Sequence, residues 1–295
     1  MNKQEFLLWN LKMFKNISIL YKENDNLAIQ TALKLQDWIK EKGIECMLFH
    51  SVGEFSTFTH SEIETIRNSD AILALGGDGT ILSISRLIGG RKIPIIGINM
   101  GSLGFITEVP RSDLFTILEQ IFSGNYEIEE RSMLHATVFR DKHIISQYLG
   151  LNDLVIGKGI LAKITNFDLI INETYVSTIK ADGIIISTPT GSTAYNLSAG
   201  GPILYPTLRG LVFTPICPHT LSVRPLVLPD HFVIDIVIAS QAKDVFLTID
   251  GQIGFPLKKY DKIRCKIAEE KTYIIAPLGR DYFKILREKL RWGER

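Results

Sequence analysis

The sequence predicts an α/β domain with a largely parallel sheet, followed by a β-rich domain and a short C-terminal helix. Three observations predict this fold. Strand and helix patterns alternate up to about residue 130, short strands separated by turns follow, and a basic amphipathic segment ends the chain. With 295 residues, 45% of them apolar, the chain is long enough to bury two cores. We therefore expect domains at 1–130 and 131–275, with 276–295 packing on the first.

The first 130 residues alternate strands with helices. Short apolar runs predict strands at 17–21, 46–49, 71–75 and 93–98. Apolar residues at helical spacing predict helices at 28–39, 81–87 and 114–122. Because this alternation builds βαβ units, ligands are expected at the carboxyl ends of the strands, where the loop after residue 75 begins.

The second part has the pattern of antiparallel strands with one buried and one wet face. The segment 231–238 predicts a strand with His231 and Asp235 on its wet side, and 262–267 predicts another. Asn172-Glu173 separates two apolar runs and predicts a hairpin. A β-rich domain is therefore expected here.

The chain ends in a predicted amphipathic helix. Residues 282–292 place Phe283, Leu286 and Leu290 on one side, and several basic residues lie among them. We expect this helix to return to the first domain.

The composition argues against several classes of partner. Lysine and arginine number 33 against 32 acidic residues, without a long run of either sign, so neither nucleic acid nor an anionic membrane surface is expected. No run of about 18 apolar residues occurs, and the apolar cluster 6–9 is too short for a signal segment. The three cysteines are widely spaced and predict neither a disulfide framework nor a zinc site. We expect a soluble, cytoplasmic protein.

The stretch with the clearest chemistry is Gly76-Gly77-Asp78-Gly79-Thr80, which joins a predicted strand to a predicted helix. Its glycines permit positive φ angles and close approach of another molecule, and the helix N-terminus that follows favours an anion such as phosphate. A carboxylate beside phosphate is unfavourable unless it binds Mg²⁺ or accepts a proton from an attacking hydroxyl. The pattern therefore indicates phosphoryl transfer to a hydroxyl. The structural alternative is a tight turn in which Asp78 caps the helix.

The richest polar stretch is 188–202, which follows Lys180-Ala181-Asp182-Gly183 and a predicted strand. Its hydroxyl, amide and backbone N–H groups can hydrogen-bond phosphate or ribose, and Tyr195 offers a flat surface to a purine or pyridine ring. The combination favours a nucleotide, and the alternative is a surface loop rich in serine and threonine.

Three shorter stretches carry groups of the same kind. Asn152-Asp153 precedes a predicted strand, and Asp250-Gly251-Gln252 ends another. The stretch 99–105 follows a third predicted strand and contains two glycines. Each can contribute contacts to a ligand, and each also fits an ordinary turn. No Gly-x-x-x-x-Gly-Lys-Ser/Thr occurs, and the first strand lacks a glycine fingerprint, so neither a P-loop nor the dinucleotide site of dehydrogenases is expected.

Together these stretches resemble the NAD kinase family. The match runs through 76–80, 99–105, 152–153, 181–183, 188–202, 214–225 and 250–252. The first of these stretches is shared with diacylglycerol and sphingosine kinases and loosely with phosphofructokinases, whereas 189–201 is far more specific. The resemblance implies a Rossmann-like N-terminal domain and a β-sandwich C-terminal domain, with the final helix returning to the first.

The resemblance also implies a reaction and a site. The terminal phosphoryl group of ATP, or polyphosphate, would pass to the 2′-hydroxyl of the adenosine ribose of NAD, giving NADP, with Asp78 as proton acceptor. A divalent ion, Mg²⁺ being the first choice, would bind with the donor, and a neighbouring subunit of a homodimer or homotetramer would complete the site. The residues implied to bind NAD are Asp78, Gly79, Asn152, Asp153, Lys163, Lys180, Asp182, Thr193, Ala194, Tyr195, Asn196, Leu197, Ser198 and Gln252.

Two positions depart from the pattern of the family. Asp153 stands where many members have glutamate, and Ser83 stands where a larger polar or basic residue is frequent. Donor and dinucleotide preference therefore stay open. Two rival functions also stay open. One is a lipid kinase of the diacylglycerol type, which would need an apolar entry for its substrate, and residues 188–198 do not offer one. The other is a sensor that binds a dinucleotide without turnover, and such a sensor would gain nothing from Asp78.

Overall fold

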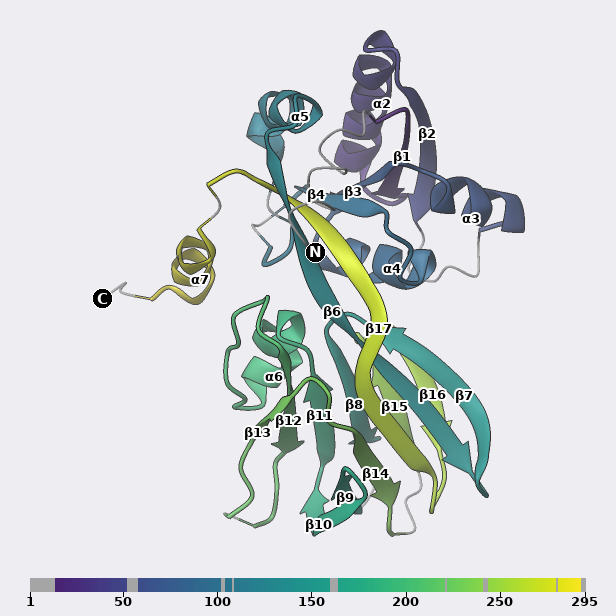
Figure 1. Ribbon diagram of the computed structural model, residues 1–295, viewed down its shortest axis with the longest axis vertical. Coiled ribbons are helices and arrows are strands. Elements are labelled where there is room, and N and C mark those ends of the chain that lie inside the picture. Colours follow the sequence, from purple (N-terminus) through teal and green to yellow (C-terminus); the bar gives the residue numbers. More distant parts are fainter. Residues whose placement is uncertain are drawn as a thin grey trace. The chain divides into compact units, whose positions relative to one another are not determined.

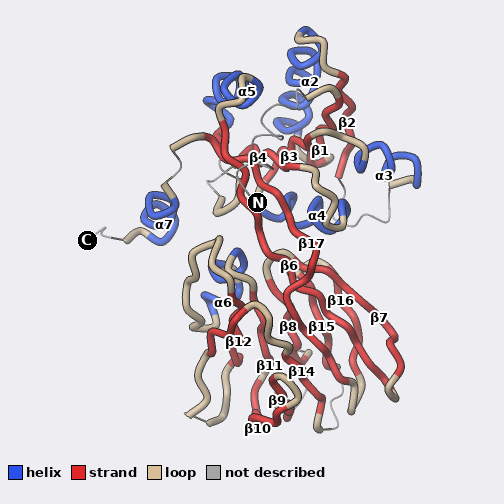
Figure 2. The backbone as a smooth tube through the Cα atoms, in the orientation of Figure 1, coloured by secondary structure: helices blue, strands red, loops and turns tan. Residues whose placement is uncertain are grey.

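The computed structural model describes residues 14–51, 58–101, 104–107, 109–159, 164–220, 222–240, 244–279 and 281–292. The chain forms two compact units, shown in Figures 1 and 2: Met1–Glu130 with Thr272–Arg295, and Arg131–Lys271. It passes into the second unit within strand β6 (Tyr126–Arg140) and returns within β17 (Lys262–Pro277). The boundary at which the chain returns to the first unit therefore lies at 271/272, inside a strand. The sequence predicts this boundary at 275/276. The two differ because β17 is one unbroken strand, and its sequence does not show where its neighbouring strands change.

The first unit is built on a parallel sheet. Its strands run in the order β17-β4-β3-β1-β2, with β5 beside β4. All four strands predicted from apolar runs are present. The bounds are β1 (Asn16–Lys22), β2 (Glu45–Ser51), β3 (Ala71–Gly76), β4 (Pro94–Asn99) and β5 (Val109–Pro110). Every residue of β4 is buried, as expected of a strand covered on both faces.

Helices cover both faces of this sheet. In Figure 1, α2 and α5 lie on one side of β1, β3 and β4, and α4 lies on the other, in contact with α3. The bounds are α2 (Asn26–Glu41), α3 (His60–Arg67), α4 (Asp78–Ile88), the 3₁₀ turn η2 (Arg111–Asp113) and α5 (Leu114–Phe122). Helix α2 starts where the carboxylate of Asp25 accepts the N–H groups of Leu27 and Ala28. The predicted helices are confirmed.

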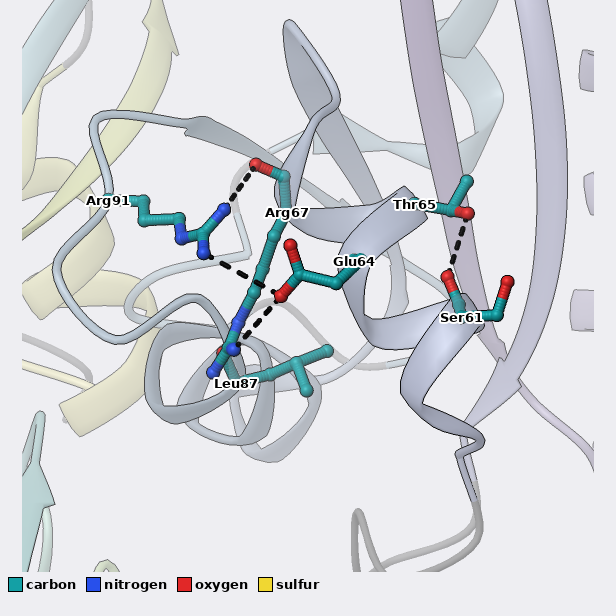
Figure 3. A network of polar contacts seen from close by, with 6 residues as sticks. All are labelled: Ser61, Glu64, Thr65, Arg67, Leu87 and Arg91. Atoms are coloured by element: carbon teal, nitrogen blue, oxygen red, sulfur yellow. Dashed lines mark hydrogen bonds and ion pairs between the residues drawn. The ribbon is translucent and has the colours of Figure 1, made fainter.

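A polar network joins α3 to the last turn of α4 (Figure 3). Glu64 Oε1 lies 3.5 Å from Arg67 Nη1 and 3.6 Å from Arg91 Nη2. Arg67 Nε donates to the carbonyl oxygen of Leu87 at 2.9 Å, and Arg91 Nη1 donates to that of Arg67 at 3.4 Å. Arg67 therefore satisfies a carbonyl that the helix end leaves without an internal partner. The network anchors the C-terminal end of α4, and the opposite end carries Asp78.

The second unit is a β-sandwich of two antiparallel sheets. One has the order β10-β9-β14-β17-β6-β7, and the other β13-β12-β11-β8-β15-β16. The strands not yet bounded are β7 (His143–Gly150), β8 (Asp153–Lys158), β9 (Thr165–Ile171), β10 (Thr174–Ala181), β11 (Gly183–Ser187), β12 (Gly210–Ile216), β13 (Leu226–Pro229), β14 (Ile234–Ile238), β15 (Val245–Ile249) and β16 (Ile253–Leu257). Buried side chains of both sheets, Phe167 and Phe213 among them, form one core.

The hairpin prediction is confirmed, and one strand prediction needs correction. Asn172 and Glu173, with φ of 47° and 65°, turn β9 into β10. Strand β14, however, begins only at Ile234, and its Asp235 is not on a wet face. That side chain is 6% exposed because basic side chains of β17 cover it: Arg264 Nε and Nη2 each donate to its carboxylate at 2.8 Å. Alternation places a residue on a face of the sheet but does not predict what covers that face.

The last helix, α7 (Tyr282–Leu290), belongs to the first unit. Its Lys289 Nζ lies 5.9 Å from the centre of the Phe105 ring. Phe283 is 57% exposed, so the buried side differs from the predicted one. Tyr282 and Phe283 are consecutive, and apolar spacing does not decide which ring is buried. The buried residues are Tyr282, Ile285 and Leu286. Among the helices of the described segments, none is long and apolar enough to cross a bilayer.

Candidate functional site

The turn between β3 and α4 places Asp78 at the first position of α4. Gly77 precedes the helix and, as a glycine, has no side chain with which to cap that end. The sequence predicts positive φ angles here, but Gly76, Gly77 and Gly79 have none. Gly76 is needed for close packing instead, because a Cβ at that position would lie 2.2 Å from Thr80 Oγ1. Asp78 thus lies at a helix N-terminus, where N–H groups and the helix dipole favour phosphate.

The carboxylate of Asp78 accepts four hydrogen bonds from one downstream segment. Its Oδ2 accepts the N–H of Phe105 at 2.8 Å. Its Oδ1 accepts the N–H groups of Ile106 and Thr107 at 3.1 and 3.0 Å, and the hydroxyl of Thr107 at 2.9 Å. We call 105–107 the carboxylate clamp. Because the bonds come from the clamp, the alternative in which Asp78 caps its own helix is wrong.

The two segments meet because their strands are neighbours. Strands β3 and β4 are parallel, with Gly76 opposite Asn99, so the turns that follow them leave the same edge of the sheet. The N–H of Met100 donates to the carbonyl oxygen of Gly76 at 3.2 Å. Asn99 Oδ1 accepts the N–H of Gly101 at 2.7 Å, which turns the chain after β4. Phe105, the last residue of the predicted stretch 99–105, is thus the first residue of the clamp.

In the second unit, three predicted site segments meet at one end of a sheet. Asp153 begins β8, Ser187 ends β11, and Ile249 ends β15. The register pairs Ser187 with Asp153 and Ile249 with Leu154. The segment before β8, the loop after β11 and the turn after β15 are therefore adjacent.

Asp250 organises this end of the sheet. Its Oδ1 accepts the N–H groups of Asn152 and Asp153 at 2.7 and 3.2 Å, and its Oδ2 accepts that of Leu151 at 3.0 Å. Its own N–H donates to the carbonyl oxygen of Asp153 at 2.9 Å. Three consecutive backbone donors compensate the burial of this carboxylate. Asp250 therefore supports the site from within.

Asp153 is the titratable group of this cluster. Its side chain is buried, with 3% of the residue exposed. Burial, and secondly the charge of Asp250, raise the pKa of Asp153 to about 7, while a hydrogen bond from the backbone N–H of Tyr195 acts in the opposite direction. Asp153 therefore changes its protonation state near neutral pH.

Asn152 carries a buried acceptor. Its Oδ1 has no hydrogen-bond partner among the described residues. Its carbonyl oxygen accepts the N–H of Thr188 at 2.9 Å and Ser187 Oγ at 3.2 Å. A Cβ on Gly191 would lie 2.1 Å from the same carbonyl oxygen, so the loop after β11 packs directly on Asn152. An unpaired buried acceptor costs about 1–3 kcal/mol, which makes this amide a candidate ligand contact.

The loop after β11 folds into the 3₁₀ turn η3 (Thr190–Thr193) and the short α6 (Tyr195–Ser198). Asn196 holds the loop together from inside. It is wholly buried, its Nδ2 donates to the carbonyl oxygens of Ser192 and Pro202 at 3.0 Å each, and its Oδ1 accepts Thr214 Oγ1 at 2.7 Å. The amide of Asn196 is therefore fully used within the protein.

Other residues of the same loop reach the surface. Tyr195 is 47% exposed and Ser198 is exposed, while Thr193, Ala194 and Leu197 are half-buried. Tyr195 therefore presents a ring face to a ligand while its backbone N–H holds Asp153. The structure brings the predicted residues of this loop together with Asn152, Asp153 and the turn after β15.

Asp182 lies at the opposite end of this sheet, and Lys180 lies two residues before it, in β10 of the other sheet. Asp182 precedes β11, whose Gly183 pairs with Gly157. Four residue-to-residue steps along β8, from Asp153 to Gly157, separate the two ends, which is about 14 Å at ~3.4 Å per residue. Asp182 Oδ1 forms an ion pair with Lys158 Nζ at 2.8 Å, and Lys180 is exposed.

Gln252 and Lys163 complete the set of predicted site residues. Gln252 is half-buried in the turn after β15, and its N–H donates to the carbonyl oxygen of Ile249 at 2.9 Å. It therefore lies at the same end as Asp153. Lys163 lies outside the described residues.

Sequence reasoning missed two residues that contact the predicted site. Thr107 binds Asp78, and its one signal was a hydroxyl three residues after Gly104. Arg131 is wholly buried, and its Nη1 donates to Thr190 Oγ1 at 3.4 Å. A single arginine beside Glu130 has the sequence pattern of a solvated surface, so no local signal could have found it.

The described residues contain no group of three or more His, Cys, Asp or Glu side chains that could hold a metal ion by itself. Asp78 offers a single carboxylate, which already accepts four hydrogen bonds. Mg²⁺ in phosphoryl-transfer sites commonly uses one or two carboxylates together with substrate phosphates and water. The residues present fit an ion that is bound chiefly by the phosphates of a nucleotide.

Comparisons with known proteins match both units. The family model of the ATP-NAD kinase N-terminal domain matches residues 17–126, and that of the ATP-NAD kinase C-terminal domain matches 151–276. The NAD kinase of Geotalea daltonii is 44% identical over 283 residues, covering 95% of this chain and 100% of the relative. The NAD kinase of Geobacter metallireducens is 46% identical over 285 residues, with the same coverage.

Two solved structures share the fold. Yeast NADH kinase complexed with NADH superposes with a TM-score of 0.81 at 25% identity, covering 97% of this chain and 90% of that one. An NAD kinase from Archaeoglobus fulgidus in complex with ATP superposes with a TM-score of 0.75 at 25% identity, covering 94% and 98%. One of these relatives therefore holds a dinucleotide and the other a nucleoside triphosphate.

Proposed function

The chain belongs to the NAD kinase family, and we propose that it transfers the terminal phosphoryl group of ATP to the 2′-hydroxyl of the adenosine ribose of NAD, giving NADP and ADP. The observation that carries the proposal is the placement of Asp78. A single carboxylate is held by four donors at the N-terminus of α4. A site that only bound phosphate would gain nothing from this negative charge.

The first unit supplies the proton acceptor and an anion-binding helix end. As the ribose oxygen bonds to the γ-phosphorus, its proton passes to Asp78, and the bond from that phosphorus to the bridging oxygen breaks, so that ADP leaves. Proton acceptance typically contributes about 10²- to 10⁴-fold. The remainder of the rate enhancement comes from positioning and from neutralising the phosphate charge.

The second unit supplies contacts to the dinucleotide. The unpaired Oδ1 of Asn152 accepts a donor of the ligand, such as an exocyclic amine or a ribose hydroxyl. The exposed ring of Tyr195 stacks on a base or on the pyridine ring. Asp153 and Gln252 border the same end of the sheet. Asn196, whose amide is used internally, supports this surface instead of touching the ligand.

A divalent ion is part of the proposal. Mg²⁺ would enter with the triphosphate and would neutralise charge on the phosphoryl group. Phosphate oxygens and water would supply most of the ligands of this ion. Magnesium is the expected ion because the available ligands are oxygens.

The separation of Asp182 and Lys180 from Asp153 supports a homo-oligomer. All three residues are assigned to NAD binding, yet Asp182 lies beyond the opposite end of the sheet from Asp153, and Lys180 lies two residues before Asp182, in β10 of the other sheet. A second copy would bring its Asp182 and Lys180 to the dinucleotide that the first copy binds, which a symmetric homodimer or homotetramer allows. The ion pair between Lys158 and Asp182 would orient that carboxylate.

The cysteines support a cytoplasmic location. All three are free. Burial raises the pKa of Cys46 to about 12, so its thiol stays protonated and unreactive at neutral pH. Thiols in this state are typical of proteins from reducing compartments.

The test is product formation by the purified protein. NAD, Mg²⁺ and either ATP or polyphosphate are supplied, and NADP is measured by mass spectrometry. NADP with one donor or both supports the proposal and identifies the donor. NAD binding by calorimetry without any NADP would support a sensor instead, and phosphorylation of diacylglycerol in vesicles without NAD binding would support a lipid kinase.

A further inference from the structure

The four hydrogen bonds to Asp78 are divided unequally between its two oxygens. Oδ1 accepts three, from the N–H groups of Ile106 and Thr107 and from the Thr107 hydroxyl. Within the described residues, Oδ2 accepts one, from the N–H of Phe105. A carboxylate oxygen offers about two lone-pair sites. Oδ1 is therefore saturated, and Oδ2 retains room for one more proton.

We propose that Thr107 is a positioning residue that selects Oδ2 of Asp78 as the atom that accepts the proton of the ribose hydroxyl. This inference rests on the proposed function and assigns a different role to each oxygen of the carboxylate. Oδ1 is held by the clamp, so the side chain cannot rotate without breaking three hydrogen bonds. Oδ2 stays available for the one proton that the reaction transfers.

Two features indicate that the Thr107 hydroxyl positions Asp78 and does not only satisfy its own hydrogen-bonding capacity. Thr107 is wholly buried, and its Oγ1 donates to a charged carboxylate at 2.9 Å, which makes a stronger bond than one to a neutral acceptor. Gly104 packs closely against Asp78 Oδ1 and Thr107 Oγ1. A Cβ on Gly104 would lie 2.1 Å from Asp78 Oδ1 and 2.1 Å from Thr107 Oγ1. Only glycine leaves room for the carboxylate and the hydroxyl to meet.

Threonine allows a nearly isosteric test. Thr107→Val removes the hydroxyl and keeps the volume. Oδ1 then keeps two backbone N–H donors and loses the only side-chain donor that it has among the described residues, so the carboxylate is held less firmly. We expect kcat to fall roughly 10- to 100-fold, in line with loss of a hydrogen bond to a charged group. The KM for NAD should stay within about twofold, because the Thr107 hydroxyl donates to Asp78, whose carboxylate is proposed to act in the chemical step. Thr107→Ser restores the donor and should return kcat to near that of the wild type.

A matched control distinguishes the effect on the position of Asp78 from the general loss of stability that follows removal of a buried hydroxyl. Thr31 is buried in the same unit, and its Oγ1 donates to the carbonyl oxygen of Leu27 at 2.7 Å. Thr31→Val removes a comparable buried hydroxyl away from Asp78, and its kcat should not change. Should Thr107→Val fail to fold, Gly104→Ala provides the second variant, because its methyl group displaces Oδ1 and should lower kcat with little change in KM.

The decisive measurement is a double-mutant cycle between Thr107→Val and Asp78→Asn, with kcat and KM measured for all four proteins. If Thr107 acts through Asp78, Thr107→Val has no further effect on kcat once Asp78 is asparagine. An equal fall in both backgrounds, a kcat like that of the wild type, or a failure of Thr107→Ser to rescue overturns the positioning role while NADP formation by the wild type stands. A wild type that makes no NADP overturns the proposed function itself, and this inference with it.

Discussion

Asp153 and Asp250 are joined by two hydrogen bonds of opposite direction. The N–H of Asp250 donates to the carbonyl oxygen of Asp153 at 2.9 Å, and Asp250 Oδ1 accepts the N–H of Asp153 at 3.2 Å. These bonds hold two carboxyl groups close together in a buried place. Burial and, secondly, the charge of Asp250 raise the pKa of Asp153 to about 7.

The raised pKa of Asp153 predicts a loss of stability as the pH rises from 3.8 to about 7. The folded protein binds this proton up to about pH 7, whereas an unfolded chain releases it near 3.8. Between these values the folded state holds more protons, so the free energy of unfolding falls as pH rises, by at most about 1.4 kcal/mol per pH unit. Urea unfolding at pH 5 and pH 8 measures this fall. Asp153→Asn should make the two values more nearly equal, chiefly by raising the value at pH 8.

A surface carboxylate provides the control for this measurement. Asp281 caps α7, and hydrogen bonds from the backbone of Lys284 and Phe283 help to hold its pKa below the usual range. It is therefore ionised at both pH 5 and pH 8. Asp281→Asn should keep the difference in unfolding free energy between pH 5 and pH 8 seen in the wild type. If Asp153→Asn kept it equally, Asp153 would not be its source.

Tyr195→Ala should weaken NAD binding while Tyr195→Phe should not. The reason is that the exposed ring, not the hydroxyl, is proposed to stack on the dinucleotide. Loss of one stacking contact costs about 1–3 kcal/mol, roughly 5- to 150-fold in affinity. Calorimetry with NAD measures it, and Tyr260→Ala, another exposed tyrosine of the second unit, serves as control. An unchanged Kd for Tyr195→Ala would exclude stacking at this position.

A mixing experiment tests whether a second copy completes the site. Asp78→Asn and Asp182→Ala should each be nearly inactive alone, for different reasons. If one site combines Asp78 of one chain with Asp182 of another, a hybrid dimer contains one intact site and one with both changes. Equal co-expression should then restore about a quarter of the wild-type activity, because half of the dimers are hybrid and half of their sites are intact. Activity no higher than that of the separate variants would place both residues in sites made by one chain.

Much of the fold could be predicted from periodicity alone. Buried strands such as 71–75 read as unbroken apolar runs, and the two-residue turn at Asn172-Glu173 is a local signal. What failed depended on contacts between distant segments. Apolar spacing in β14 could not reveal that Arg264 covers Asp235, and the uninterrupted pattern of β17 hid the change of partners at Thr272.

The site was predictable where chemistry and backbone geometry coincide in one stretch. Asp78 carries its charge into a predicted strand-to-helix turn, so both facts are local. The clamp was not predictable, because Thr107 meets Asp78 only through the pairing of β3 with β4. The internal role of Asn196, in α6, was hidden for a similar reason: Thr214, which donates to its amide oxygen, lies on β12.

The central claim is that the carboxylate of Asp78 serves chemistry and not binding. Asp78→Asn keeps the shape of the side chain, and its amide oxygen can still accept the three clamp bonds now made by Oδ1, so the variant should fold. The measurement is kcat for NADP formation by the wild type and by Asp78→Asn, with NAD affinity measured by calorimetry on both. We predict a fall in kcat of at least about 100-fold with NAD affinity changed by less than about threefold. A variant that turns over within a few-fold of the wild type would contradict the account.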